Sequence, residues 1–215
     1  MIELSSKTIV GRKLPLRELM KTIKADKATK EDAKKVESVV LTNVLSKDTL
    51  NAKNAGNVRE VFVVEIVLKD TRELPKQFLT AMDRTINMHT VFVLRHEGKS
   101  MLCAAIKEKG DKGIKVGKYH CGEWRDDKER LGLPPDAIDV DGAYAAIWEW
   151  ILPLKRRQGE SAAEYVARHE KVQMLNTDAK KLQRAVDAEV QPKLRFEYNA
   201  QLKAVLAELE KETKA

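Results

Sequence analysis

The sequence predicts an α+β protein with a mixed core sheet of about four strands, flanking helices and a C-terminal helical arm that resembles a coiled coil. An apolar run over residues 58–69 precedes a helical pattern over 74–86 and a second apolar run over 89–95. This is the order of a strand, a crossover helix and a second strand. In the last part of the chain, apolar residues recur at helical and heptad spacings. We therefore expect a core over residues 1–152 and an arm over 153–215.

Within the core, apolar patterning predicts strands over residues 60–69, 89–95, 100–107 and 115–124. Glycine-containing turns separate the last three strands, at Glu97-Gly98 and at residues 109–113. A later helix over residues 141–152 carries an apolar stripe formed by Tyr144, Ile147, Trp148 and Ile151. The last three strands should therefore form an antiparallel meander beside the crossover unit.

Two helices are expected before the core. The first covers residues 14–24 and is opened by Pro15, with apolar residues three and four positions apart. The second begins at Thr29 as N-cap and runs through Leu45. Its apolar side would consist of Val36, Val39, Val40 and Val44.

Charge and composition exclude some classes of protein. With 43% hydrophobic and 34% charged residues the chain is not disordered, and 5% aromatic residues leave little for base stacking. The net charge of +7 divides into +5 over residues 1–58, −1 over 59–150 and +3 over 151–215. Basic flanks can bind nucleic-acid phosphates, or they can simply be solvated lysine-rich surfaces. The candidate nucleic-acid-binding residues are Lys30, Lys34, Lys35, Lys155, Arg156 and Arg157.

Glu65 is the anomaly of the first core strand, because it lies among apolar residues and needs a partner once it loses water. The structural interpretation is a buried ion pair, with Lys69 or Arg84 as the expected partner, or an edge-strand residue that reaches solvent. The alternative is a metal-dependent nuclease site built from Glu60, Glu65 and Lys69 with Asp83, which would use Mg²⁺. Lys69 lies four residues beyond Glu65, about 13 Å along a strand, which favours the structural interpretation.

No other cofactor or metal is expected, because the chain has no phosphate-binding loop and no paired Cys or His ligands. Its two cysteines, Cys103 and Cys121, are expected to be free thiols. Neither a signal peptide nor the run of about 20 apolar residues that a membrane span needs is seen in the sequence. A cytoplasmic location, away from the membrane, is therefore expected.

The arm should begin at Ser161, which forms a capping box with Glu164. Pro192 interrupts the pattern, giving either two helices or one kinked helix. The arm would pack on its own core, on a copy of itself or on another protein. The residues expected to make this contact are Leu182, Val186, Tyr198, Leu202, Val205 and Leu209.

Several segments resemble a bacterial and archaeal family of unknown function, DUF4391. They include Lys13-Leu-Pro-Leu-Arg17, residues 45–51, the core segments Glu65–Lys69 and Met82–Asn87, and the arm segment 199–209. The chain departs from the family pattern before Asn199, where it has Val190-Gln-Pro-Lys-Leu-Arg-Phe196.

The resemblance implies a gene neighbourhood of helicases and DNA methyltransferases in restriction-like or antiphage systems. It assigns no catalytic residue. We therefore expect a non-catalytic accessory subunit that contacts a protein partner, such as a helicase or a methyltransferase, through the C-terminal helices and DNA through the basic flanks. The alternatives are a degenerate metal-dependent nuclease and a structural protein that self-associates through the arm.

Overall fold

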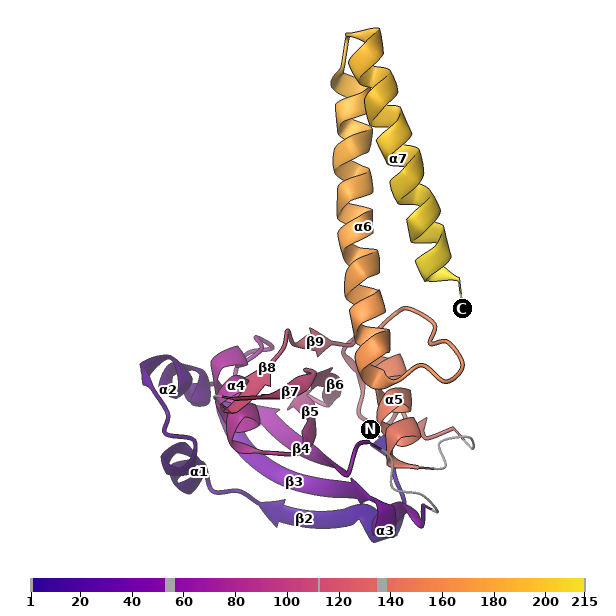
Figure 1. Cartoon of the computed structure of the whole chain (residues 1–215). Coiled ribbons are helices and arrows are strands. Elements are labelled where there is room, and N and C mark those ends of the chain that lie inside the picture. Colours follow the sequence, from indigo (N-terminus) through magenta and orange to yellow (C-terminus); the bar gives the residue numbers. More distant parts are fainter. Residues whose placement is uncertain (1, 53–56, 112, 135–138, 215) are drawn as a thin grey trace. The chain divides into compact units, whose positions relative to one another are not determined.

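The structure is a computed structural model of the chain, and it describes residues 2–52, 57–111, 113–134 and 139–214. The chain forms two compact units, Met1–Leu152 and Pro153–Ala215, which are described in turn (Figure 1). Within the described ranges, no helix combines the length and the apolar character needed to cross a membrane.

A seven-stranded mixed sheet forms the centre of the first unit. Its order is β10-β6-β5-β4-β3-β2, with β9 also paired to β6. The strands are β2 (Ile9–Lys13), β3 (Val36–Ser46), β4 (Glu60–Leu68), β5 (His89–His96), β6 (Lys99–Ala104), β9 (His120–Cys121) and β10 (Arg125–Asp126). Among the described strands of this sheet, β4 and β5 are the parallel neighbours, and α4 (Lys76–Thr85) connects them. The predicted mixed sheet and its crossover helix are confirmed.

The segment before β4 differs from the prediction. The expected helix over residues 29–45 is wrong, because α2 (Lys27–Lys34) ends early and the rest forms β3. Register shifts between Val36 and Ser38 and between Leu41 and Asn43 interrupt the alternation of β3. The buried Val36 and Val39 are consequently three residues apart, which imitates the spacing of a helix. The β-branched valines themselves favour a strand.

The meander is also more broken than predicted. A separate hairpin is formed by β7 (Lys107–Gly110) and β8 (Gly113–Val116), so the strand expected over 115–124 is divided. At Gly117 the backbone N–H donates to the Ile106 carbonyl, and a Cβ there would lie 3.1 Å from that oxygen. The turn at Glu97-Gly98 is confirmed, with positive φ at both residues, as tight hairpins require.

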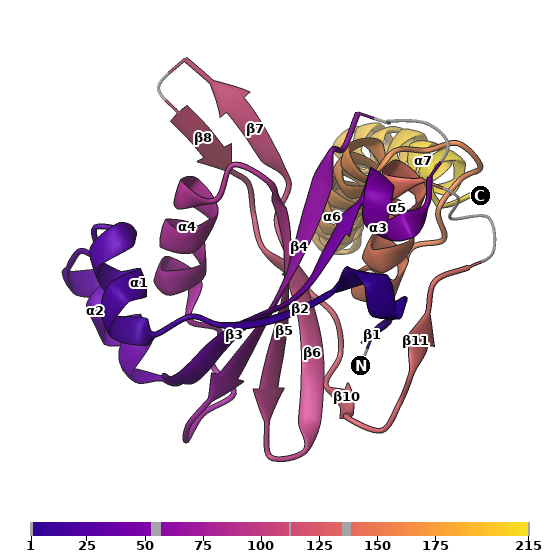
Figure 2. The ribbon, with the colours of Figure 1, turned by 90° about the horizontal axis from the view of Figure 1, so that it is seen from below.

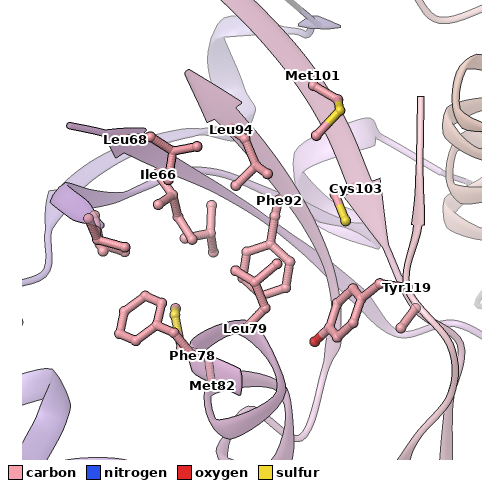
Figure 3. Close-up of a cluster of buried hydrophobic side chains, with 14 of the residues drawn as sticks. Ile66, Leu68, Phe78, Leu79, Met82, Phe92, Leu94, Met101, Cys103 and Tyr119 are labelled. Carbon is pink, nitrogen blue, oxygen red and sulfur yellow. The ribbon is translucent and has the colours of Figure 1, made fainter. Parts of the chain in front are cut away.

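Helices cover both faces of the sheet (Figure 2). On one side lie α4, α2 and α1 (Leu16–Thr22), and on the other lies α5 (Val140–Ile151). The core under α4 is shown in Figure 3; its largest fully buried members are Phe78, Leu79, Met82, Phe92, Ile66 and Leu94. All four residues of the apolar stripe predicted for α5, Tyr144, Ile147, Trp148 and Ile151, are buried. Short elements complete the unit: β1 (Ile2–Glu3) paired with β11 (Leu131–Gly132), a 3₁₀ turn η1 (Ser6–Thr8) and α3 (Lys47–Leu50).

The second unit is a pair of packed helices, α6 (Ala162–Ala188) and α7 (Pro192–Thr213). The expected capping box of Ser161 and Glu164 begins α6. Pro192 occupies the first position of α7, where its missing N–H costs no helical hydrogen bond. The arm therefore consists of two helices joined by a short turn, not of one kinked helix (Figure 1).

Candidate functional sites

A buried ionic cluster lies between α4 and the sheet. Asp83, in the last turn of α4, is 0% exposed. It accepts hydrogen bonds from Lys107 Nζ at 3.0 Å and from the Tyr119 hydroxyl at 2.5 Å. Lys107 also donates to the Thr90 hydroxyl at 2.9 Å and to the Ile86 carbonyl at 3.1 Å. Figure 3 shows the hydroxyl of Tyr119 pointing toward α4. The cluster ties the crossover helix to β5, to β7 and to the segment before β9.

Burial dominates the electrostatics of this cluster. It raises the pKa of Asp83 and lowers the pKa of Lys107, because each charged form has lost its water. The attraction between the two charges opposes both shifts, and the hydrogen bond from Tyr119 also lowers the pKa of Asp83. Burial raises the pKa of Tyr119, so its hydroxyl remains a donor. Removing any one member would leave a buried polar group without its partner.

A cleft of about 260 Å³ opens beside this cluster, where β4 and β5 begin. Its lining consists of Asn57, Arg59, Glu60, Asn87, Met88, His89 and Lys109. Burial and the nearby charge of Lys107 lower the pKa of His89, whose buried Nδ1 has no hydrogen-bond partner. Two cationic and two amide side chains against one carboxylate suit a polar or anionic ligand better than an apolar one.

Glu65 has a different partner from those predicted. Its carboxylate lies 3.2 Å from Nη1 of Arg95 on the neighbouring strand β5, and Arg95 also pairs with Asp127 at 2.7 Å. Glu65 and Asp127 are 17% and 18% exposed, so the network is mostly buried. The prediction that Glu65 forms an ion pair is confirmed, but Lys69 and Arg84 are not its partners. Lys69 is exposed, just beyond the end of β4.

The four candidate catalytic residues do not gather at one place. Val64, Ile66 and Leu68 belong to the core under α4, so Glu65 points to the opposite face of the sheet. Asp83 belongs to α4 itself, and Glu60 lines the cleft where β4 begins. In the described part of the chain, no three His, Cys, Asp or Glu side chains are grouped to hold a metal ion.

Some of the candidate nucleic-acid-binding residues form bonds within the chain, whereas the side chains of others are exposed. Arg157 donates to the carbonyls of Lys211 and Lys214, which lie at the C-terminal end of α7. Arg156 donates to the Glu160 carbonyl. Arg157 thus joins the linker to the end of α7, an arrangement that suits a helix C-terminus, whereas the Arg156 bond lies within the linker.

On α2, Lys34 pairs with Glu31 at 2.8 Å, and Lys35, which follows the helix, pairs with Asp32 and Glu73, each at 3.1 Å. The side chains of Lys30 and Lys155 are exposed. Nucleic-acid binding by the basic flanks stays a prediction.

The residues expected to contact a partner lie mainly inside the arm. Ala179, Val186 and Leu202 form its buried centre, and Leu182, Tyr198 and Val205 pack against them. Leu209 is half-buried near the other end of α7. These side chains bring α6 and α7 of one chain together, so a contact with another molecule through the same stripe would compete with that packing. The exposed apolar side chains of the arm are instead Met174, Val190, Phe196 and Leu206.

Sequence reasoning missed Lys107, Tyr119 and Arg95. Lys107 stands at the end of an expected strand and Tyr119 within another, and each resembles an ordinary surface residue of a hairpin. The signal that could have found Arg95 is its position: in parallel register Glu65 is opposite Val93, which places Arg95 two residues on and on the same face.

The chain was compared with protein-family models, curated proteins and solved structures. The sequence model of the Domain of unknown function (DUF4391) family matches residues 2–209. The chain belongs to this family. The family resemblance inferred from the sequence is therefore confirmed, and the match includes both the sheet and the two arm helices. No curated protein and no solved structure matches the chain. A family without an assigned chemistry transfers no mechanism.

Proposed function

We propose that this DUF4391 protein is a non-catalytic accessory subunit of a nucleic-acid-processing assembly of the restriction-like or antiphage kind. In this proposal, the turn between α6 and α7 binds the protein partner. The observation that carries the proposal is the exposure of two large apolar side chains there: Val190, in the turn, is 89% exposed and Phe196, in the second turn of α7, is 75% exposed.

The arm has features of a rigid support for such a contact. At its base, Arg168 pairs with Glu160 at 2.6 Å and donates to the Glu212 carbonyl, while Lys171 pairs with Glu208 at 2.6 Å. These bonds join α6, α7 and the preceding linker, and the apolar centre joins the helices nearer the turn. A few anchors on a preorganised surface, often aromatic, commonly carry most of the binding energy of a protein interface, and Phe196 is the aromatic side chain exposed here.

Co-expression tests the protein contact. The full chain is produced with a helicase or a DNA methyltransferase of the kind that the family resemblance implies, and the complex is measured by size-exclusion chromatography with light scattering. We expect Val190→Ser with Phe196→Ser to weaken the complex at least about tenfold, or about 1.4 kcal/mol. Ile9→Ser, at a 64% exposed apolar residue of the edge strand β2, is the matched control and should leave it unchanged. Equal binding by both variants would reject the turn as the contact.

The contribution of the basic flanks is tested separately. Binding of the full chain to double-stranded DNA is followed by fluorescence anisotropy at two salt concentrations. If Lys30 and Lys155 contact phosphates, their joint replacement by alanine should weaken binding and reduce its salt dependence, by about one unit of slope per lost contact. Binding that is unaffected by salt, or by the substitutions, would remove DNA from the proposal without affecting the protein contact.

A further inference from the structure

The two cysteines of the chain face each other across neighbouring strands. Cys103 of β6 and Cys121 of β9 are direct partners in antiparallel register. The Gly122 N–H donates to the Leu102 carbonyl, so the adjacent pair of residues is the hydrogen-bonded one. The cysteines therefore occupy the closer, non-hydrogen-bonded kind of pair, with Cα atoms about 4.5 Å apart. Disulfides form at Cα separations of about 4.4–6.8 Å.

Their sulfur atoms are already in contact, since Sγ of Cys103 lies 2.8 Å from Sγ of Cys121 and both residues are free thiols, as the sequence predicts. The two sites differ in access. Cys103 is 0% exposed in the core under α4, whereas Cys121 is exposed. An external reagent can therefore reach one thiol of the pair directly, and the second thiol is held in contact with the first.

The pKa shifts of the two thiols agree with this difference in exposure. The hydrogen bond with Cys103 lowers the pKa of Cys121, while burial raises the pKa of Cys103. The thiolate is the nucleophile in thiol–disulfide exchange, so Cys121 is the thiol suited to make the first attack. Cys103 is placed to attack the mixed disulfide that would then exist on Cys121.

We propose that Cys103 and Cys121 form a site of reversible oxidation, which reacts with a small disulfide such as oxidised glutathione. The Cys121 thiolate attacks one sulfur of the reagent, forming a mixed disulfide and releasing one glutathione thiolate. The Cys103 thiol then attacks Sγ of Cys121, and its proton passes to the second glutathione thiolate as that thiolate leaves. Two protein thiols are oxidised to one disulfide, and one glutathione disulfide is reduced to two thiols.

The product would fasten β9 to β6. β9 has only two residues, and Tyr119 immediately precedes it. Because Tyr119 donates to Asp83, the bond would also fix the segment that holds the buried ionic cluster. This inference does not depend on the proposed accessory function.

Mass spectrometry of the full chain tests the proposal. The folded protein is incubated with mixtures of reduced and oxidised glutathione, its remaining thiols are blocked with N-ethylmaleimide, and the intact mass is measured. The chain contains two cysteines, so a disulfide within one chain can only be this pair. We expect a product that has lost two hydrogens, takes up no maleimide and returns to two free thiols with dithiothreitol.

Two variants separate the roles of the thiols. Cys103→Ser should stop at a stable glutathione adduct on Cys121, and Cys121→Ser should remain unmodified because its remaining thiol is buried. The wild-type measurement decides the question even if a variant fails to fold. Two thiols that still react with maleimide at the most oxidising ratio, a glutathione adduct that persists on the wild type, or disulfide-linked dimers in its place would overturn the proposal.

Discussion

Replacing Asp83 with alanine should destabilise the first unit strongly, because it leaves an ammonium group in the core without its counter-charge. Asp83 is 0% exposed and the Lys107 side chain is 6% exposed, so water cannot replace the lost carboxylate without opening the structure. Breaking a buried ion pair by removing one partner costs about 3–5 kcal/mol. The lost bond from Tyr119 is part of this figure and is not added to it. Tyr119→Phe alone removes one hydrogen bond to a charged group and should cost about 1.5–3 kcal/mol.

Urea unfolding followed by tryptophan fluorescence measures these changes. The tryptophans, Trp124, Trp148 and Trp150, all belong to the first unit, so the signal reports on the unit that contains the cluster. Asp70→Ala is the matched control, because Asp70 is an exposed residue just beyond β4, and it should change the free energy of unfolding by less than about 0.5 kcal/mol.

The double variant provides the sharpest check of this reasoning. Asp83→Ala combined with Lys107→Met removes both charges, so its cost should be clearly smaller than the sum of the two single costs. A loss below about 1 kcal/mol for Asp83→Ala, or additive losses in the double variant, would refute the view that the two groups form a coupled buried pair.

Three further predictions concern the arm and the cleft. Arg168→Ala removes the cation that pairs with the mostly buried carboxylate of Glu160 and leaves it with the hydrogen bond from the Arg157 N–H. It should destabilise the arm by about 3–5 kcal/mol, seen as faster amide hydrogen exchange in α6 and α7, while exposed Arg184→Ala should not. Leu202→Ala should cost about 2–5 kcal/mol with no change of mass by light scattering, since Leu202 packs within its own chain; a loss of mass would instead indicate contact between copies. Burial lowers the pKa of His89 below its ordinary 6.5, so its contribution to stability is present above pH 6.5 and is lost as the pH falls through the folded pKa. The Tm should therefore fall on acidification, and less so in His89→Gln.

Much of the fold could be predicted because its signals are local. The strand, crossover helix and strand around α4, the turn at Glu97-Gly98 and the capping box at Ser161 each depend on residues close together in the sequence. β3 could not be predicted in the same way. Its two register shifts erase the alternation that identifies a strand, and its identity comes from pairing with β2 and β4, which are distant parts of the chain.

The candidate sites were harder to predict for a related reason. The sequence predicts that Glu65 needs a cation and indicates Lys69 and Arg84, whereas Arg95 lies 30 residues away on a parallel neighbour. Asp83 is a catalytic candidate in the nuclease alternative, but its role in the structure is set by Lys107 and Tyr119, at separations of 24 and 36 residues. Such partners follow from strand order and register, which a single sequence does not reveal.

The placement of these charges bears on the choice between an accessory subunit and a nuclease. Metal-assisted hydrolysis of DNA needs carboxylates that converge on one or two ions. Here Glu65 is bonded to Arg95 on one face of the sheet, and Asp83 is bonded to Lys107 under the helix on the other. To bind one ion together, Glu65 and Asp83 would both have to leave their partners. Arg95 and Lys107 would then lose these carboxylates while remaining mostly buried. A substitution of Glu65 by glutamine therefore separates the two functions: in the accessory subunit it weakens one ion pair, whereas in a nuclease it would abolish magnesium-dependent cleavage.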